Sequence, residues 1–142
     1  MRNRHAGVWL RITLLPAGAL CCGFLAAAPP VSAEDSDDPI YRVVEGKADA
    51  RTYNGYRRYN AACNHCHGPD GVGSSFGPSL IEETIDAAAF RTAILGGRAK
   101  GDSVMKGFAD DFNVAPYVDD ILAYLQARAD GRLGRGRPAR LD

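Results

Sequence analysis

The sequence predicts an all-α protein of a few helices joined by long loops. Three segments repeat apolar side chains at intervals of three or four residues, which is the spacing of one helix face. No segment alternates apolar and polar residues for long enough to predict a strand. Loops of this length are unusual in so small a domain unless something other than protein fills the centre.

The N-terminus predicts a secretory signal peptide over residues 1–33. Basic residues open the chain, an apolar stretch follows, and the small residues of "VSA" precede the expected cleavage after Ala33. Arg11 and Pro16 interrupt the apolar stretch and leave it short for a span, so we expect no stable membrane insertion. Export places the mature protein in the periplasm, an oxidising compartment where free thiols seldom persist.

The mature chain divides into three parts. Residues 34–48 begin with the acidic run "EDSDD" and predict a flexible lead-in. The folded domain is expected over 49–131, and an arginine-rich tail follows over 132–142. Cleavage removes three arginines and no acid, so that the 17 acidic residues of the chain outnumber the remaining bases. This balance argues against nucleic-acid binding.

The first helix is expected over residues 49–63. Asp49 or Thr52 can cap its N-terminus, since both side chains can accept from backbone amides of the first turn. Its apolar face is formed by residues at helical spacing: Tyr53, Tyr56, Tyr59 and Cys63.

Two further helices follow the glycine-rich loop after this one. Asp86 opens a helix that Gly96 and Gly97 stop. The last helix has Pro116 in its first turn and ends at Gly131. Between these two helices we expect a loop. The tail beyond the last helix is expected to be a solvated, disordered end, or else a docking arm.

The stretch "CNHCH" at 63–67 concentrates metal-binding and redox-active residue types. A structural zinc site usually needs a second pair of ligands a dozen or more residues away, and the mature chain has none. A thiol oxidoreductase would place Cys-x-x-Cys between a strand and a helix. Here a helix precedes the pair and a loop follows it, so both interpretations are disfavoured.

The same stretch matches the attachment pattern of c-type haem, Cys-x-x-Cys-His. Cys63 and Cys66 lie on one helical turn and can reach the two vinyl groups along one porphyrin edge. His67 then lies beneath the iron and supplies an imidazole ligand. After cleavage these are the only cysteines, which agrees with one covalently bound haem c.

Met105 is the candidate for the second axial position of the iron. It is the only methionine left after cleavage, and it lies in a predicted loop, 98–113. His65 lies within the attachment stretch and cannot reach the far face. A methionine can instead simply fill a gap in a core. With a haem motif upstream and no competing soft ligand, we expect Met105 to bind the iron.

These residues resemble the class I monohaem cytochromes c, and the resemblance extends over about 49–130. In that family a glycine and an aromatic residue on the first helix precede the haem motif, as Gly55 and Tyr59 do here. The last helix crosses at the glycine with an aromatic–leucine pair, matched by Tyr124 and Leu125. The resemblance implies the cytochrome c fold, a few helices wrapped around one covalently bound haem.

A second family motif lies in the loop after the haem pattern. Gly77, Pro78 and Leu80 match the Gly-Pro-x-Leu of the class I cytochromes. By analogy the carbonyl of Pro78 accepts a hydrogen bond from the Nδ1 atom of His67, which orients the ring and raises its basicity.

Two long stretches, "YNGYRRY…CHGPDGVGSSFGPSL" and "YVDDILAYLQARADGRLGRGRP", resemble a narrower group. They are similar to periplasmic cytochromes that accept electrons from quinoprotein (PQQ-dependent) methanol and alcohol dehydrogenases. One departure concerns the distal ligand. Proline usually follows the methionine in that group, whereas Lys106 follows Met105 here, although Phe108 is retained.

The resemblance implies an electron-transfer protein that is not an enzyme. We expect a monomeric periplasmic carrier that accepts electrons from a quinoprotein dehydrogenase and passes them to a terminal oxidase or another cytochrome. Two alternatives remain. The chain can be the haem subunit of a stable oxidoreductase complex, or, if Met105 does not bind, an open-site haem protein such as a peroxidase or gas sensor.

Overall fold

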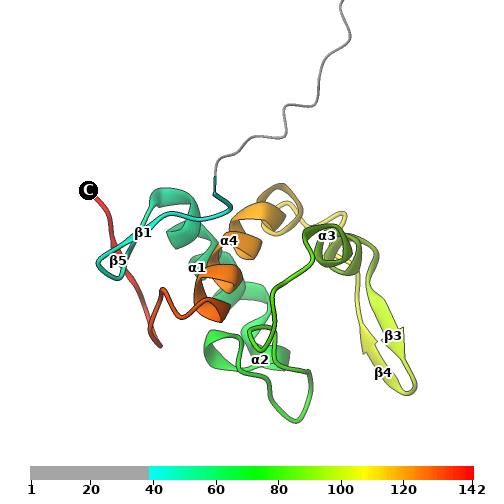
Figure 1. Cartoon of the computed structure of the whole chain (residues 1–142). Coiled ribbons are helices and arrows are strands. Elements are labelled where there is room, and N and C mark those ends of the chain that lie inside the picture. The colour runs from blue at the N-terminus through cyan, green and yellow to red at the C-terminus, as the bar shows by residue number, and fades with distance from the viewer. Residues whose placement is uncertain (1–38) are drawn as a thin grey trace, which may run out of the picture. The chain divides into compact units, whose positions relative to one another are not determined.

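The structure is a computed structural model that describes residues 39–142 (Figure 1). The expected signal peptide and the start of the lead-in lie outside the described residues. The helices and 3-10 helices are α1 (Ala50–Ala62), α2 (Asn64–His67), η1 (Pro69–Gly71), α3 (Ala87–Gly96), η2 (Ala115–Tyr117) and α4 (Val118–Ala129). The strands are β1 (Val43–Val44), β2 (Lys47–Ala48), β3 (Arg98–Lys100), β4 (Ser103–Met105) and β5 (Ala139–Arg140).

Helix α1 confirms the first predicted helix and selects one of its two candidate caps. The side chain of Asp49 accepts a hydrogen bond of 2.9 Å from the backbone N–H of Thr52. This bond satisfies an amide that the helix itself leaves unpaired. Helix α3 likewise begins after Asp86, whose side chain accepts from the N–H of Ala89 at 2.6 Å.

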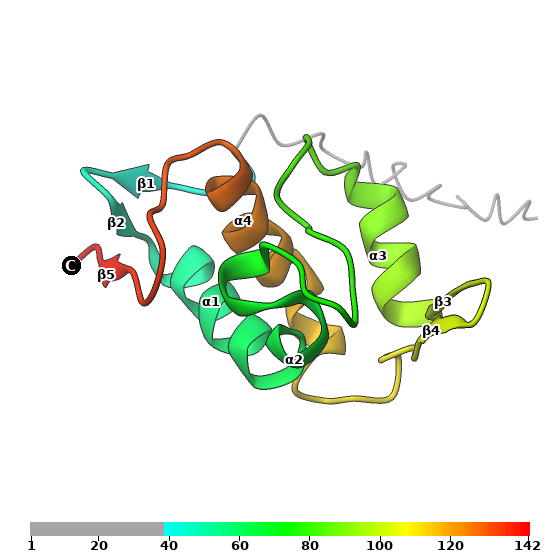
Figure 2. The same ribbon diagram turned by 90° about the horizontal axis from the view of Figure 1, so that it is seen from below.

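The core forms where α1 crosses α4, as Figure 2 shows from below. A side chain at Gly55 would place its Cβ 1.8 Å from the backbone oxygen of Asp120, so only glycine permits this crossing. Tyr59, Tyr124 and Leu125 are fully buried beside it. The rings of Tyr59 and Tyr124 pack with their centroids 5.6 Å apart. The crossing implied by the family resemblance is therefore present.

A small sheet joins the two ends of the described chain. Strand β2 pairs antiparallel with β1 and parallel with β5, in the order β1-β2-β5. Residues 43–44, 47–48 and 139–140 are thus paired strands, which differs from the expected flexible lead-in and solvated tail. Strands of two residues are too short for alternation to reveal them, and the pairing of β2 with β5 is non-local.

A two-stranded hairpin carries Met105. Strands β3 and β4 pair antiparallel, with Met105 opposite Arg98. The sequence predicted a loop here, because Gly101 and the charged residues around it obscure any alternation. In Figures 1 and 2 the hairpin extends from the end of α3, at the opposite end of the described unit from the β1-β2-β5 sheet. Within residues 39–142, no helix has the length and apolar character that crossing a membrane requires.

Candidate functional site

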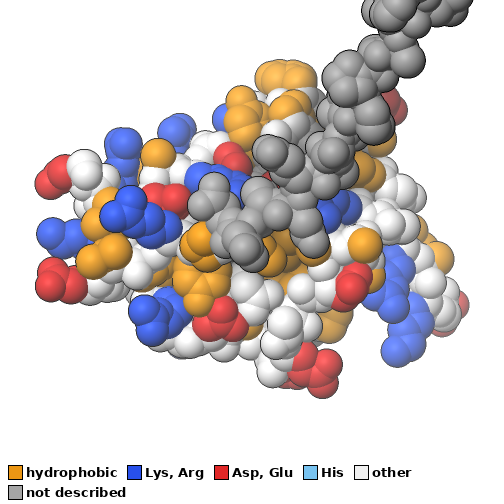
Figure 3. Space-filling model, turned by 45° about the horizontal axis from the view of Figure 1, so that its top comes forward, with side chains coloured by type: hydrophobic (Ala, Val, Ile, Leu, Met, Phe, Trp, Pro, Cys, Tyr) orange, Lys and Arg blue, Asp and Glu red, His pale blue; other side chains and the backbone are white. Residues whose placement is uncertain are grey.

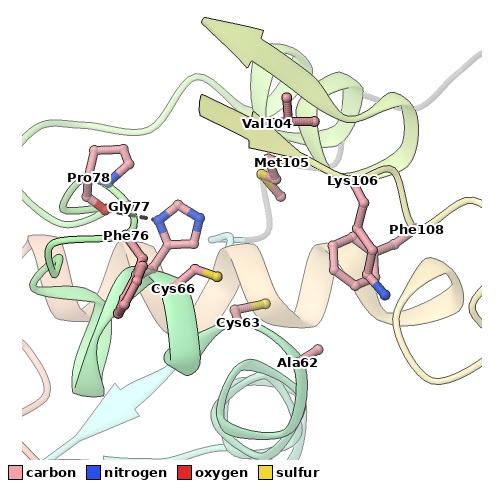
Figure 4. A pocket seen from close by; sticks show the side chains of 11 residues that line it. Ala62, Cys63, Cys66, Phe76, Gly77, Pro78, Val104, Met105, Lys106 and Phe108 are labelled. Atoms are coloured by element: carbon pink, nitrogen blue, oxygen red, sulfur yellow. Dashed lines mark hydrogen bonds between the residues drawn. The ribbon is translucent and has the colours of Figure 1, made fainter. Parts of the chain in front are cut away.

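The two cysteines lie on one helical turn at the junction of α1 and α2. Cys63 ends α1, where its N–H donates to the carbonyl of Tyr59 at 2.8 Å. The carbonyl of Cys63 accepts from the N–H groups of Cys66 and His67, at 3.2 and 3.0 Å. Figure 4 shows both thiols directed toward the same space. Cys63 is buried, whereas Cys66 is exposed at the rim.

The His67 side chain is held by one hydrogen bond to the following loop. Its Nδ1 atom donates to the carbonyl oxygen of Pro78 at 2.9 Å, the bond drawn in Figure 4. Gly77 permits this approach, since a Cβ there would lie 2.9 Å from the Cys66 carbonyl oxygen and 3.1 Å from Nδ1. With Nδ1 engaged, the Nε2 atom is the nitrogen left to bind a metal.

Met105 lines the same cavity from the opposite wall. It enters from β4, and Figure 4 shows its sulfur across the cavity from Cys63 and Cys66. The cavity has a volume of about 390 Å³ and is mostly apolar, within the roughly 300–1,000 Å³ of ordinary cofactor pockets. Its walls are Ala62, Cys63, Cys66, His67, Phe76, Gly77, Pro78, Val104, Met105, Lys106 and Phe108.

A smaller, wholly apolar cavity of about 60 Å³ adjoins it. Cys63, His67 and Met105 belong to both cavities, so the apolar space continues inward to Leu125 on α4. The structure therefore brings together all five residues that the sequence predicted for the site. A planar apolar group attached to both thiols fits this space, with a nitrogen and a thioether sulfur available to its centre.

Burial controls the protonation of the inner thiol. Removal from water raises the pKa of Cys63 to about 11, and the neighbouring Cys66 adds to the rise. The Cys63 side chain is therefore a neutral thiol at neutral pH in the chain without its cofactor. A thiolate used for redox exchange has a lowered pKa instead.

The other interpretations of the cysteine motif find no support in the described chain. Within residues 39–142, no group of three or more His, Cys, Asp or Glu side chains is placed to hold a metal ion. The cysteine pair follows helix α1 rather than a strand, so the surroundings of a thiol oxidoreductase are not those seen here.

Sequence reasoning missed two groups of residues around the site. Phe76 and Val104 line the cavity but belong to no local pattern, because they come from a loop and a short strand. Asp70 was assigned only to a glycine-rich loop. It is a buried carboxylate that contacts residues 135 and 136 of the tail, and the only local signal was a charged residue between Pro69 and Gly71.

Comparisons with known proteins agree with this geometry. The family model described as "Cytochrome C oxidase, cbb3-type, subunit III" matches residues 50–125. Cytochrome c-553I of Paracoccus denitrificans is 41% identical over 111 residues, which cover 73% of this chain and 49% of that protein. Cytochrome c-555 of Methylococcus capsulatus is 33% identical over 91 residues, which cover 62% of this chain and 71% of that protein.

A solved structure shares the fold. The crystal structure of the c-type cytochrome XoxG from Methylobacterium extorquens AM1 superposes with a TM-score of 0.64 at 43% identity, covering 68% of this chain and 62% of that one. This chain spans about half the length of the Paracoccus relative. The matched family model nevertheless covers more than half of this chain, including the cysteine motif, all of α1 and most of α4. The chain therefore belongs to the cytochrome c family, and its cofactor is covalently bound haem c.

Proposed function

We propose that this protein is a periplasmic one-electron carrier in which His67 and Met105 bind the haem iron from opposite faces. The observation that carries the proposal is the position of Met105, across one apolar cavity from the two cysteines that attach the haem. The haem supplies the redox change. With His67 and Met105 both as ligands, the iron would have no position left for a substrate, which favours electron transfer over catalysis.

The chain's own residues attach the haem, orient its ligand and influence its reduction potential. Cys63 and Cys66 fix the haem through thioethers, and the Pro78 carbonyl orients His67 through its hydrogen bond. The apolar walls exclude water from the iron and so influence its potential. Lys106 follows Met105 where proline is usual, and its Nζ atom lies 4.8 Å from the centroid of the Phe108 ring. This cation–π contact gives the lysine a partner other than the iron.

For the donor we propose a quinoprotein (PQQ-dependent) methanol or alcohol dehydrogenase, and for the acceptor an oxidase or another cytochrome. The sequence resemblance and the similarity to the cytochrome XoxG of Methylobacterium extorquens support this assignment. Such encounters are brief and use small interfaces, below about 1,200 Å² in total. The mature protein, after cleavage behind Ala33, would act as a monomer. Addition of the purified dehydrogenase and its alcohol should reduce the ferric cytochrome, and a failure to reduce it would argue against this donor.

The second candidate is a haem subunit of a stable oxidoreductase complex. It is favoured by the description of the matching family model, which names an oxidase subunit. Co-purification with other subunits through a high-salt wash would support it, whereas a monomer at every salt concentration would support the carrier.

Replacement of Met105 tests the ligand assignment. A thioether bound to ferric iron gives a weak charge-transfer band near the red end of the spectrum, and we predict that Met105→Ala abolishes it. The potential should fall, because methionine ligation favours ferrous iron. Met105→Leu is the matched control for volume and should lose the band as well. A wild-type protein without the band at neutral pH would contradict ligation and favour an open or lysine-bound iron.

A further inference from the structure

The C-terminal tail lies against the loop that follows the haem motif. Asp70, three residues after His67, sits in η1 with only 6% of its surface exposed. Its backbone adopts φ +61°, a left-handed conformation that few residues other than glycine accept. A buried carboxylate in such a conformation persists only when its surroundings hold it there.

The groups that hold the Asp70 carboxylate come from the tail and from α4. The N–H of Gly136 donates to it at 3.0 Å, the Nε of Arg135 at 3.3 Å, and the hydroxyl of Tyr124 at 3.4 Å. The carbonyl oxygen of Asp70 accepts from the Nε of Arg128 at 3.4 Å. The side-chain carboxylate and the backbone carbonyl of Asp70 are therefore both hydrogen-bonded to the C-terminal part of the chain.

The loop that Asp70 shapes also positions the partner of His67. The carbonyl of Gly71, the next residue, accepts from the N–H of Leu80 at 2.8 Å and from the Ser79 hydroxyl at 3.3 Å. These bonds fasten residues 79–80 directly after Pro78, whose carbonyl accepts from His67. The contacts thus run without a break from the tail, through Asp70 and Gly71, to the imidazole ring.

We propose that residues 135–136 of the tail hold the loop over residues 68–80 in place through Asp70, and that Asp70 is a positioning residue for His67. We call this contact between the tail and Asp70 the clasp. This proposal rests on the ligation of iron by His67 proposed above. The clasp keeps the Pro78 carbonyl in place, and the hydrogen bond it accepts makes His67 a stronger donor to iron. A stronger donor favours ferric iron, so the closed clasp holds the reduction potential down.

Opening the clasp and removing its charge have opposite effects on the potential. A loosened hydrogen bond to His67 weakens the donor and raises the potential. Loss of an arginine near the haem removes positive charge, which favours ferric iron and lowers the potential. The sign of the change therefore separates positioning from simple electrostatics.

A pair of truncations of the haem-loaded protein tests the proposal. Truncation after Gly134 removes Arg135, Gly136 and Arg137, whereas truncation after Arg137 keeps all three and removes only β5 and the residues around it. Both retain Leu133, which is buried and accepts a hydrogen bond from Arg128. Relative to the longer protein, the shorter one should exchange the Nδ1 proton of His67 with solvent several-fold faster, measured by NMR, and should have a higher potential.

Arg135→Ala repeats the test without shortening the chain, since the Arg135 side chain is 71% exposed and its loss should not prevent folding. Arg132→Ala is the matched control. It removes the same charge from the same tail, and within residues 39–142 its side chain forms no hydrogen bond or ion pair. Faster Nδ1 exchange and a higher potential in Arg135→Ala than in Arg132→Ala are expected.

The proposal is overturned if the Nδ1 proton of His67 exchanges at an unchanged rate. It is also overturned if the reduction potential falls, as loss of the positive charge alone would cause. If His67 does not bind the iron, the result is different. In that case the wild-type protein itself would lack His67 ring signals shifted by the iron, before any variant is compared.

Discussion

The hydroxyl of Tyr59 joins the first helix to the loop behind the haem motif. Tyr59 is fully buried and donates to the carbonyl oxygen of Gly68 at 2.5 Å. Burial raises the pKa of Tyr59 to about 12, because a phenolate in the core would lose its hydration. A tyrosine in the unfolded chain ionises near pH 10. The stabilisation is therefore complete below about pH 10 and is lost as the pH rises toward about 12.

Replacement of this hydroxyl should lower stability at neutral pH. We predict that Tyr59→Phe reduces the free energy of unfolding of the haem-loaded protein by about 1–3 kcal/mol, because the Gly68 carbonyl stays buried without its donor. The loss of stability from about pH 10 to 12 should also be smaller than in the wild type. Tyr124 and Tyr41 contribute to the remainder, since burial raises the pKa of each. Denaturant titrations over this pH range measure both effects.

Tyr117→Phe is the control for this prediction. Tyr117 is only partly buried, and its ring stacks with Arg58, whose guanidinium lies 3.7 Å from the ring centroid. This contact does not need the hydroxyl, so the variant should unfold like the wild type at every pH. Equal losses in the two variants would show that the hydrogen bond to Gly68 contributes nothing specific.

The contact of α1 with α4 depends on the absence of one side chain. We predict that Gly55→Ala destabilises the protein by at least about 1–3 kcal/mol, the usual cost of overpacking, because backbone rather than a flexible side chain blocks the new methyl group. Gly96→Ala is the control in α3, where a Cβ meets nothing within 4 Å. It should stabilise the protein slightly, since alanine favours a helix. Thermal unfolding of both haem-loaded variants gives the comparison.

The β3–β4 hairpin presents charges beside the haem cavity. Arg98, Lys100 and Lys106 are exposed there, and Figure 3 shows Lys and Arg side chains both at this end of the described unit and at the end with the β1-β2-β5 sheet. We predict that Lys100→Ala with Lys106→Ala slows second-order reduction by the quinoprotein dehydrogenase. The difference should vanish with added salt, because exposed charges are screened beyond about 8 Å at physiological ionic strength.

The control removes two charges from the sheet at the other end. Lys47→Ala with Arg140→Ala leaves the hairpin intact, and the dehydrogenase should reduce this double variant at the wild-type rate. If the two double variants behave alike, or if no rate depends on salt, the hairpin is not the docking element.

Local signals explain which elements the sequence could predict. Asp49 and Asp86 cap their helices as expected, because capping needs only residues three positions apart. The pairing of Lys47 with Ala139 could not be predicted, since nothing in two-residue strands identifies a distant partner. The segment around Met105 was predicted as a loop but is a hairpin, because its three-residue strands are too short and too charged to show alternation. The length and periodicity of apolar patterns in the sequence predict helices far better than they predict short strands.

The candidate site shows a similar division. Cys63, Cys66 and His67 follow from a local motif, and Pro78 and Met105 from the resemblance and from elimination; the structure places all five at one cavity. The role of Asp70 could not be predicted. Its partners on α4 and in the tail become neighbours only after α4 has packed on α1 and the tail has turned back.

The haem occupies the place of a core in the molecule as a whole. The cavity of about 390 Å³ continues inward to Leu125, so the protein alone leaves its centre open. Chains this small bury only about 60–65% of their unfolded surface and are marginally stable. We predict that Cys63→Ala with Cys66→Ala yields an unfolded chain by circular dichroism. A colourless protein that is helical and unfolds cooperatively would show that the fold does not need its cofactor.

The parallel pairing of β2 with β5 also fixes the order in which the molecule can be assembled. Strand β2 emerges early in synthesis and export, but its partner follows only after nearly all of the described chain. Contacts so distant in sequence form late, because the intervening loop must first be closed. The cysteine motif needs no such contact. Haem attachment can therefore proceed on an open chain, and β5 pairs with β2 only after the cofactor is in place.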